Sequence, residues 1–302
     1  MAIRPYREAD RGDILRLSDE IFGPPRVTGW QPSRQIESLE KDCIKLVPEN
    51  ERLRVYAAAY ALDDSHFRLD LLVPHGLAGD SAADLLGRIE SDVRRAGGKY
   101  LQARIPENAV ETLELLLSTG FEEIHRMRGM SLSAVDFKPD RWIDAGRDLE
   151  AQGILAATLA DEMRAGRDPE SKLGRLLERA REGWPSPDPT KPGKMAAGDL
   201  GSFFTGIASP ELASIAKYQD KYIAFTSAAP GNQLGTAVHP DFRGRGIAAL
   251  LKAVNILNCI KNGHKEFESC SASPAMQKVN VKLGYEFTGQ VEVRLLKRLI
   301  AF

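Results

Sequence analysis

The segment that most constrains this chain of 302 residues is Leu234–Leu251, which reads LGTAVHPDFRGRGIAALL. Its first five residues suit a short strand, and His239-Pro240 ends that strand because proline cannot continue a ladder. The turn Arg243–Gly246, RGRG, follows. From Ile247 to Ile260 apolar residues recur every three or four positions, which predicts a helix with one buried face. The order is therefore strand, basic glycine-rich turn, helix.

A helix that begins directly after glycines is suited to holding an anion. Its first turn has unpaired N–H groups and the positive end of the helix dipole, and glycines let a phosphate approach the backbone. Arg243 and Arg245 would add charge and directed donors. A tight turn with two solvated arginines is the plainer alternative, but the strand before and the helix after favour anion binding. Four polar residues lie off the apolar stripe of the helix: Lys252, Asn255, Asn258 and Lys261.

Two known kinds of phosphate-binding turn fit this segment less well. Gly244–Ala249 satisfies the dinucleotide fingerprint G-x-G-x-x-A, and Glu266 and Glu268 lie about where its ribose-binding acid would be. However, that fingerprint needs its first glycine directly after the strand, and residues 239–243 intervene here. Too little chain follows for the further βα units of a dinucleotide fold. The P-loop pattern is absent because no Gly-Lys-Ser/Thr occurs.

The segment resembles instead the acyl-CoA-binding motif Arg/Gln-x-x-Gly-x-Gly/Ala of the GCN5-related N-acetyltransferase (GNAT) superfamily. It appears here as Arg243–Ala248, RGRGIA, after the typical Val238-His239-Pro240. Downstream, Ser273–Met276 and Val279–Tyr285, VNVKLGY, resemble the last helix of that superfamily and the Leu-Gly-Phe/Tyr that closes it. The resemblance is good over residues 213–302 and weaker elsewhere.

This resemblance implies an acyltransferase that binds acetyl-CoA as a co-substrate and needs no metal. The coenzyme would lie on Arg243, Gly244, Arg245, Gly246, Ile247 and Ala248. An amine would attack the thioester directly while both substrates are bound, so most of the catalysis would be positioning. Backbone N–H groups near Ala237 and Val238, at the splayed end of the strand, would stabilise the charge that develops on the thioester oxygen.

Glu268 and Asn280 are the candidates for catalytic roles. A base must deprotonate the amine, and Glu268 is preferred to Glu266 and His239 because it lies nearer the carboxyl end of its predicted strand, where open α/β sheets bind ligands. The superfamily often protonates the leaving thiolate with a tyrosine where this chain has Asn280. Asparagine cannot act as an acid, so Asn280 would hydrogen-bond the pantetheine arm and solvent would protonate the thiolate.

The first half of the chain repeats the order of the second, and Leu117–Phe121 echoes Val281–Tyr285. We therefore predict a tandem pair of GNAT-like domains, 1–138 and 139–302, similar to two-domain acyltransferases related to mycothiol synthase. The predicted fold class is α/β, each domain a mixed, mostly antiparallel twisted sheet flanked by helices. Such a pair could replace a homodimer, which favours a monomer.

The first copy differs where the chemistry matters. It has Ala78-Gly79-Asp80-Ser81 where the second copy has RGRG. Both arginines are lost, and an aspartate would repel a pyrophosphate. We interpret residues 1–138 as a degenerate, mainly structural domain. The alternative is that Gly76 and Gly79 form a cradle of altered register.

Elsewhere, hydrophobic periodicity predicts helices over residues 10–22, 33–46, 81–96, 108–118, 149–163 and 173–180. Strands are predicted over residues 2–5, 55–62, 67–73, 100–105, 130–132, 213–217 and 222–227. The proline-rich run 184–193 cannot hold regular structure. Trp184 and Asp188 within it are candidate substrate contacts.

The composition describes a globular protein, with 43% hydrophobic and 27% charged residues. A net charge of -1 argues against nucleic acid as the main partner. No segment is apolar enough to span a bilayer, and the charged N-terminus is unlike a signal peptide. Three scattered cysteines indicate reduced thiols in a cytoplasmic protein. No metal-ligand spacing occurs among the cysteines and histidines.

The leading hypothesis is an N-acetyltransferase that acts on a small-molecule or peptide amine, with the acceptor unidentified. The second is a non-catalytic CoA-binding or scaffold protein, consistent with Asn280 and with the degenerate first copy. The third is an NAD(P)-dependent oxidoreductase.

Overall fold

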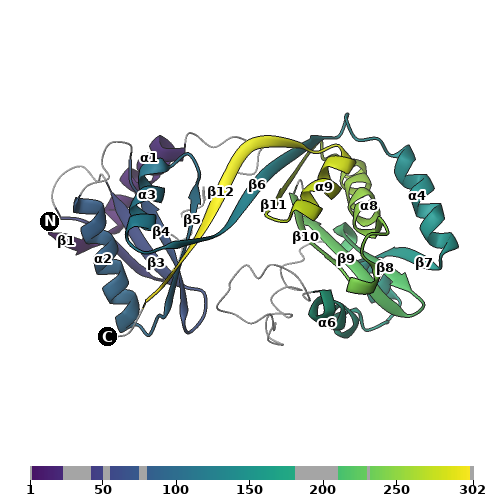
Figure 1. The fold of residues 1–302 in the computed structure, drawn as a ribbon, viewed down its shortest axis with the longest axis horizontal. Coiled ribbons are helices and arrows are strands. Elements are labelled where there is room, and N and C mark those ends of the chain that lie inside the picture. Colours follow the sequence, from purple (N-terminus) through teal and green to yellow (C-terminus); the bar gives the residue numbers. More distant parts are fainter. Residues whose placement is uncertain are drawn as a thin grey trace. The chain divides into compact units, whose positions relative to one another are not determined.

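The computed structural model describes residues 2–22, 42–49, 55–74, 80–180, 210–229 and 232–299. The chain divides into two compact units, unit 1 with Met1–Arg128 and Gly289–Phe302, and unit 2 with Gly129–Thr288 (Figure 1). The sequence prediction divided the chain between residues 138 and 139 and left the last strand in the second half.

The final strand explains most of this difference. Strand β12 (Glu286–Arg298) pairs antiparallel with β5 (Tyr100–Pro106), from Glu292 opposite Pro106 to Arg298 opposite Tyr100. The C-terminal end of the chain thus completes the sheet of unit 1. A local sequence pattern does not indicate a partner strand almost two hundred residues away, so the sequence could not assign β12 to the sheet of unit 1.

Unit 1 contains one sheet and three α-helices among its described residues. Its other strands are β1 (Ile3–Pro5), β2 (Ile44–Pro48), β3 (Tyr56–Ala61), β4 (His66–Leu72) and the start of β6 (Glu122–Ser133). Its helices are η1 (Glu8–Asp10), α1 (Arg11–Phe22), α2 (Asp80–Arg95) and α3 (Val110–Ser118). The strands lie in the order β1-β2-β3-β4-β5-β12, antiparallel except for the parallel pair β4 and β5.

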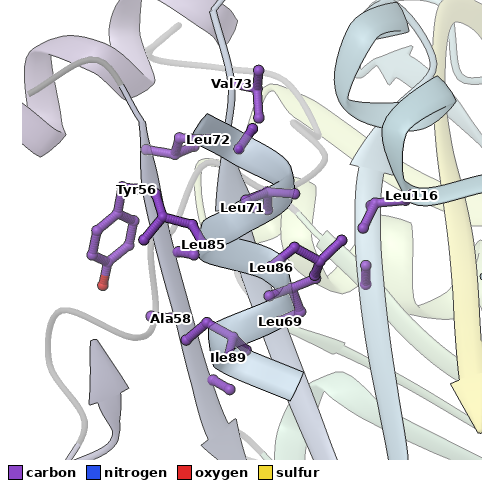
Figure 2. Packing of buried hydrophobic residues seen from close by; sticks show 14 of the residues in the cluster. Tyr56, Ala58, Leu69, Leu71, Leu72, Val73, Leu85, Leu86, Ile89 and Leu116 are labelled. Atoms are coloured by element: carbon purple, nitrogen blue, oxygen red, sulfur yellow. The ribbon is translucent and has the colours of Figure 1, made fainter. Parts of the chain in front are cut away.

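Helix α2 covers one face of the unit 1 sheet (Figure 2). Its residues Leu85, Leu86 and Ile89 are at most 1% exposed and lie in one buried cluster with Leu69 and Leu71 of β4. The spacing of one, three and four residues puts these side chains on a single helix face. Full burial of one such side chain contributes about 1.5–3 kcal/mol, so this cluster is the main core of unit 1.

Unit 2 repeats the order of unit 1. Its strands are the end of β6, then β7 (Ile154–Thr158), β8 (Ala213–Tyr218), β9 (Lys221–Ala229), β10 (Asn232–Val238) and β11 (Glu266–Ser271). Its helices are α4 (Asp140–Ala151), α5 (Leu159–Arg164), α6 (Pro169–Ala180), η3 (Pro210–Leu212), η4 (Pro240–Phe242), α8 (Ile247–Lys261) and α9 (Pro274–Leu283). The strands lie in the order β6-β11-β10-β9-β8-β7, and β10 with β11 is a parallel pair.

Each unit therefore runs from a strand through one or more helices to three antiparallel strands, a helix, a parallel strand and a further helix. Most predicted elements coincide with observed ones to within two or three residues. That the two units arose by duplication stays a prediction.

Two predicted helices were wrong in part. Residues 44–46 belong to strand β2, and 33–41 of that predicted helix lie outside the described residues. Residues 154–158 of the predicted helix 149–163 form β7, which pairs with β8 from Ile154 opposite Tyr218 to Thr158 opposite Ser214. Leucine and alanine in that run favour a helix, but Gly153, at a φ of 77°, ends α4. Pairing with β8 then decides the conformation.

Helices cover both faces of the unit 2 sheet. On one face, Phe225 lies in a buried cluster with Leu173 of α6. On the other, Ala224 lies in a cluster with Leu251 of α8. The sheet thus separates the α5 and α6 side from the α8 side.

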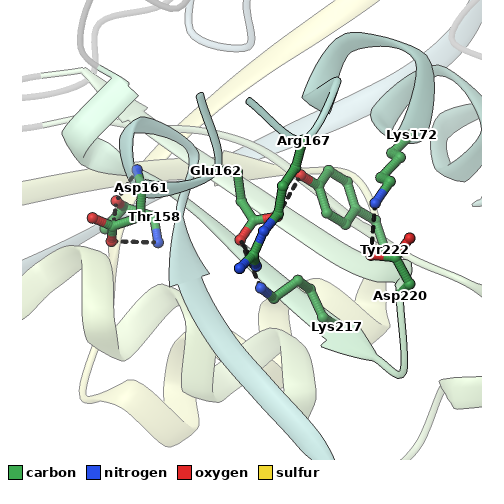
Figure 3. A network of polar contacts seen from close by, with 8 residues as sticks. All are labelled: Thr158, Asp161, Glu162, Arg167, Lys172, Lys217, Asp220 and Tyr222. Atoms are coloured by element: carbon green, nitrogen blue, oxygen red, sulfur yellow. Dashed lines mark hydrogen bonds and ion pairs between the residues drawn. The ribbon is translucent and has the colours of Figure 1, made fainter. Parts of the chain in front are cut away.

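A buried carboxylate joins α5 to the sheet (Figure 3). Glu162 is 2% exposed and accepts hydrogen bonds from Lys217 Nζ at 2.6 Å, Tyr222 Oη at 2.9 Å and Arg167 Nη1 at 3.2 Å. Desolvation acts to raise the pKa of Glu162, but the hydrogen bonds from Lys217 and Tyr222 outweigh it and hold that pKa below its ordinary value. The carboxylate is therefore charged at neutral pH and binds α5 to β8 and β9.

We expect Glu162→Gln to lower the free energy of unfolding by about 3–5 kcal/mol at neutral pH, because Lys217 then keeps a buried charge without its carboxylate. Glu178→Gln, exposed on α6, is the matched control and should change little. Chemical unfolding measures both.

The pH dependence of this difference has a definite sign. Because the native pKa of Glu162 is depressed, its contribution is complete above the ordinary carboxyl pKa near 4.3 and is lost as the pH falls through the lower native value. The gap between wild type and Glu162→Gln should shrink in that acidic range. A gap that is the same at about pH 3 as at neutral pH would show that the charge is irrelevant.

Candidate functional site

The site begins where β10 ends. His239 donates its backbone N–H to the Ile223 carbonyl at 2.8 Å, and Pro240 then opens the short helix η4. Phe242 fastens this helix to the sheet, with its ring centroid 5.5 Å from that of Tyr218 on β8 and 5.9 Å from that of His239. The strand thus ends at His239-Pro240 as expected, and the packing of the Phe242 ring holds the chain in place there.

Two glycines turn the chain from η4 into α8. Gly244 has a φ of 79° and Gly246 a φ of 83°, in the left-handed region that side chains disfavour. A Cβ built at either glycine would meet no atom of the described residues within 4 Å. Glycine is thus required by backbone conformation, and no described side chain fills the space beside either residue.

The first turn of α8 has unused donors. Gly246 is its N-cap and supplies no side-chain cap, and no acidic residue lies in the first turn. The N–H of Leu250 makes the first helical bond, to the Gly246 carbonyl at 3.1 Å. The N–H groups of Ile247 and Ala248 have no helical partner and point from the positive end of the helix dipole.

The two arginines of the turn play different parts. Arg243 donates to the Val238 carbonyl at 3.2 Å and to the Ala180 carbonyl at 2.6 Å, and so ties the turn to the ends of β10 and α6. Arg245 is exposed, donates to the Asp241 carbonyl at 3.2 Å and lies 5.0 Å from the centre of the Phe242 ring. Both arginines are exposed, but Arg243 donates to two carbonyls and Arg245 to one. Arg245 is therefore the more available of the two charges, and Arg243 mainly holds the turn in place.

The parallel strands β10 and β11 pair at a single position, Asn232 opposite Glu268. Beyond it β10 continues to Val238 and β11 to Ser271 without further pairing to each other. The register of β10 against β9 also shifts between Gln233 and Thr236, which marks a bulge. The two strands therefore part toward their carboxyl ends, where open α/β sheets bind ligands.

This parting leaves the main-chain N–H of Val238 facing the gap. Because the N–H of His239 points to β9, alternation along an antiparallel strand directs the N–H of Ala237 to β9 as well and that of Val238 to the opposite edge. That edge faces the gap beside β11. Of the two residues expected to stabilise the thioester oxygen, Val238 is the one whose N–H faces the gap.

The three candidate bases differ in burial and in their position relative to the gap. Glu268 is half-buried and stands at the last paired position before the strands part. Glu266 is exposed two residues earlier and accepts a hydrogen bond from Ser133 Oγ at 3.0 Å. His239 accepts the Asp241 N–H on Nδ1 at 3.3 Å, which is a turn-forming role. Of these three candidates, Glu268 is therefore the residue that lies where the gap between β10 and β11 begins.

Asn280 lies fully buried on α9. Its Nδ2 donates to Ser269 Oγ of β11 at 3.1 Å and contacts Met130 Sδ at 3.6 Å. Its Oδ1 is buried and has no hydrogen-bond partner among the described residues. The amide thus holds α9 to β11 through its donor and keeps an acceptor unused.

The expectation that four polar residues lie off the buried face of α8 was wrong for Lys252 and Asn255, which are 2% and 0% exposed. Asn255 accepts a hydrogen bond from Ser214 and approaches the Thr226 carbonyl at 3.5 Å. Helix α8 is covered on more than one side, so a single stripe underestimates its buried surface. Lys252 Nζ lies 5.9 Å from the centre of the Tyr285 ring and has no carboxylate partner among the described residues.

Other predicted features lie outside the described residues, among them Trp184, Asp188 and Gly79. In the described ranges, no three His, Cys, Asp or Glu side chains gather as a metal site. Across the same ranges, no helix combines the length and apolar character needed to cross a membrane.

No family model and no curated protein sequence matches the chain. Solved structures do match it. A GNAT from Sphaerobacter thermophilus aligns with 99% of this chain and 96% of its own, with a TM-score of 0.66 and 16% identity. A tandem GNAT protein from the clavulanic acid biosynthesis pathway, solved without acetyl-CoA, aligns with 100% and 99%, with a TM-score of 0.65 and 16% identity.

A third solved structure contains a glucosamine N-acetyltransferase region within a fungal multi-domain GH3 β-N-acetylglucosaminidase. It aligns with 98% of this chain and 38% of its own, with a TM-score of 0.71 and 14% identity. These alignments span both units. The chain has the GNAT fold. The predicted resemblance and the predicted α/β class with two GNAT-like domains are confirmed.

The positive charge of the buried Lys252 destabilises the folded protein. Desolvation lowers the pKa of Lys252 to about 8, and the nearby Cys270 acts weakly in the other direction. Unfolded lysine has a pKa near 10.4, so burial of the charge costs about 3 kcal/mol. The sequence pattern missed this residue because lysine is ordinarily a surface residue.

We therefore expect Lys252→Met to raise the free energy of unfolding by up to about 3 kcal/mol at neutral pH. Wild type loses its own proton at Lys252 between pH 8 and the unfolded value, so its stability rises there and the gain of the variant should shrink. Unfolding of both proteins at pH 7 and at about pH 10 measures this. A variant that is less stable at both pH values would mean that the ammonium group is satisfied.

Proposed function

We propose that this protein is an acyl-CoA-dependent N-acyltransferase that moves an acetyl group from acetyl-CoA to an amine. The observation that carries the proposal is a pair of main-chain donor sites, the Val238 N–H at the parted strands and the N–H groups of the turn Gly244–Gly246 and the first turn of α8. An extended coenzyme with a diphosphate at one end and a thioester at the other matches such a pair.

The likeness to N-acetyltransferases over both units supports this activity. Unit 2 rather than unit 1 is the proposed coenzyme-binding unit, because it alone has the two arginines and glycines before its central helix. Helix α2 of unit 1 begins at Asp80, an acidic residue at the matching place. The acceptor amine is left open, and peptide and small-molecule amines are both candidates.

In the proposed reaction, the diphosphate lies on the N–H groups of the turn and on Arg245. The thioester carbonyl lies in the gap and its oxygen accepts the Val238 N–H. The amine nitrogen attacks the carbonyl carbon, the C–S bond breaks, and the CoA thiolate leaves. Glu268 takes the proton of the amine through water.

Asn280 has a narrower role than a catalytic acid. Its donor is occupied by Ser269, so its free Oδ1 would accept an N–H from an amide of the pantetheine arm. The thiolate then takes its proton from solvent. The second hypothesis, a coenzyme-binding protein without turnover, is favoured by this replacement of an acid with an amide.

We expect Gly246→Ala to weaken CoA binding at least tenfold in isothermal titration. The methyl group would occupy the space where a phosphate meets the backbone, and the left-handed φ would cost about 1–2 kcal/mol. Gly263→Ala is the matched control, because Gly263 has a φ of 85°, equally open surroundings and a place at the other end of α8. It should lose stability and keep its affinity for CoA.

Charge reversal tests the same site without backbone strain. Arg245→Glu should weaken CoA binding, with a loss that diminishes at high salt, whereas Arg147→Glu on the exposed side of α4 should not. If Gly246→Ala and Arg245→Glu both bind CoA as wild type does, the coenzyme lies elsewhere and the proposal fails.

Turnover separates an enzyme from a binder. We expect free thiol to be released from acetyl-CoA when a panel of amines is added, and Glu268→Gln to reduce that release about 100-fold or more without changing CoA affinity. Asp241→Asn, an exposed carboxylate in the same turn region, is the matched control. CoA binding without thiol release for any amine would favour the non-catalytic alternative.

A further inference from the structure

Unit 1 also has a pair of parallel strands that part. The ladder of β4 with β5 runs from His66 opposite Tyr100 to Leu69 opposite Ala103, and both strands continue for three residues beyond it. Phe67 and Leu69 of β4 face the α2 side and lie in the main core of unit 1. Alternate residues of these strands therefore face the opposite side of the sheet.

Part of that opposite side is polar, although Tyr56, Ala58 and Leu72 on the same side belong to the hydrophobic core. We call this part the polar face and define it by residues that alternate with the core positions: Tyr60, Arg68, Asp70, Gln102, Arg104, Glu292 and Arg294. Cross-strand register makes Arg68 the direct neighbour of Tyr60 and of Gln102. Arg104 is directly opposite Arg294. Cross-strand partners are about 4.5–5.5 Å apart at Cβ and diagonal ones about 7–8 Å, so Arg104 neighbours both Arg68, on the diagonal, and Arg294, directly opposite.

Arginines outnumber carboxylates among the residues that define this face. Three arginines face two carboxylates, Asp70 and Glu292, and Arg294 Nε binds Glu292 Oε1 at 2.9 Å. Like charges directly opposite on neighbouring strands are destabilising. Such a cluster is favoured where a bound anion offsets the repulsion among the arginines.

Arg68 is the residue that points to a ligand. It is 9% exposed, and its Nε is buried without a hydrogen-bond partner. No ion pair or hydrogen bond involves its side chain within the part of the chain that the structure describes. An N–H donor buried without an acceptor, as at Arg68 Nε, is costly. Gln102, Arg104 and Arg294 are half-buried and leave the area reachable from solvent.

We propose that the polar face of unit 1 binds a small oxyanion, a carboxylate or a phosphoryl group, which the guanidinium fork of Arg68 holds with help from Arg104 and Arg294. Planar forks of N–H donors match both groups in geometry and charge. The site lies beside parted parallel strands, as the proposed coenzyme site of unit 2 does, but it does not depend on the function proposed there. Unit 1 would then recognise a ligand despite its altered glycine segment.

The test uses the full-length protein and thermal unfolding in phosphate, in succinate and in potassium chloride at equal ionic strength. We expect phosphate or succinate to raise the Tm of wild type by about 2–4 °C relative to chloride. Arg68→Leu should abolish this rise and, without the anion, should be as stable as wild type or more so, since it removes a buried donor that has no acceptor. If Arg68 had only a structural role, its removal would instead destabilise the protein.

Two variants make the outcome specific. Arg88→Leu, exposed on α2, should respond to the anion as wild type does. Phosphate could also bind the turn before α8, so Arg245→Glu should keep the response if the site is in unit 1 and lose it if the site is in unit 2. Response to phosphate alone identifies a phosphoryl group, and response to succinate alone a carboxylate. An equal response in wild type and Arg68→Leu, or no response to either anion, overturns the proposal.

Discussion

The candidate site depends on where the main-chain hydrogen bonding between neighbouring strands ends. In unit 2, β10 and β11 pair at one position and then part. The chain then turns through Gly244 and Gly246 into α8, whose first N–H groups have no helical partner. Because unpaired main-chain donors require acceptors, the gap and the helix end are two places where a ligand would be held. The proposed coenzyme has an acceptor at one end and negative charge at the other, which suits these two places.

Buried polar groups around these two places differ in how they are satisfied. Glu162 has three donors and strengthens its unit, and Asn255 is hydrogen-bonded between α8 and the sheet. Lys252 and the Oδ1 of Asn280 have no such partners. Unsatisfied buried groups cost stability, and chains keep them mainly where a site needs them. Their position on α8 and α9, beside β11, is consistent with the proposed coenzyme site.

The two units place similar strand geometry in different chemical surroundings. In both, a parallel pair parts toward its carboxyl end. Unit 2 follows its first parallel strand with arginines and left-handed glycines, whereas unit 1 gathers its arginines on a sheet face at Arg68, Arg104 and Arg294. The two proposed anion sites thus differ in their donors, which are main-chain N–H groups in unit 2 and guanidinium groups in unit 1.

Local chemistry let the sequence alone determine the strand, the glycine turn and the helix of Leu234–Leu251, because proline, left-handed glycines and helical periodicity act within a few residues. It could not predict that residues 154–158 form a strand, that β12 joins the sheet of unit 1, or that Lys252 is buried. Those outcomes depend on which distant strand supplies hydrogen bonds and on how many sides of a helix are covered. Only the tertiary structure decides them, because the contacts involved join residues far apart in the chain.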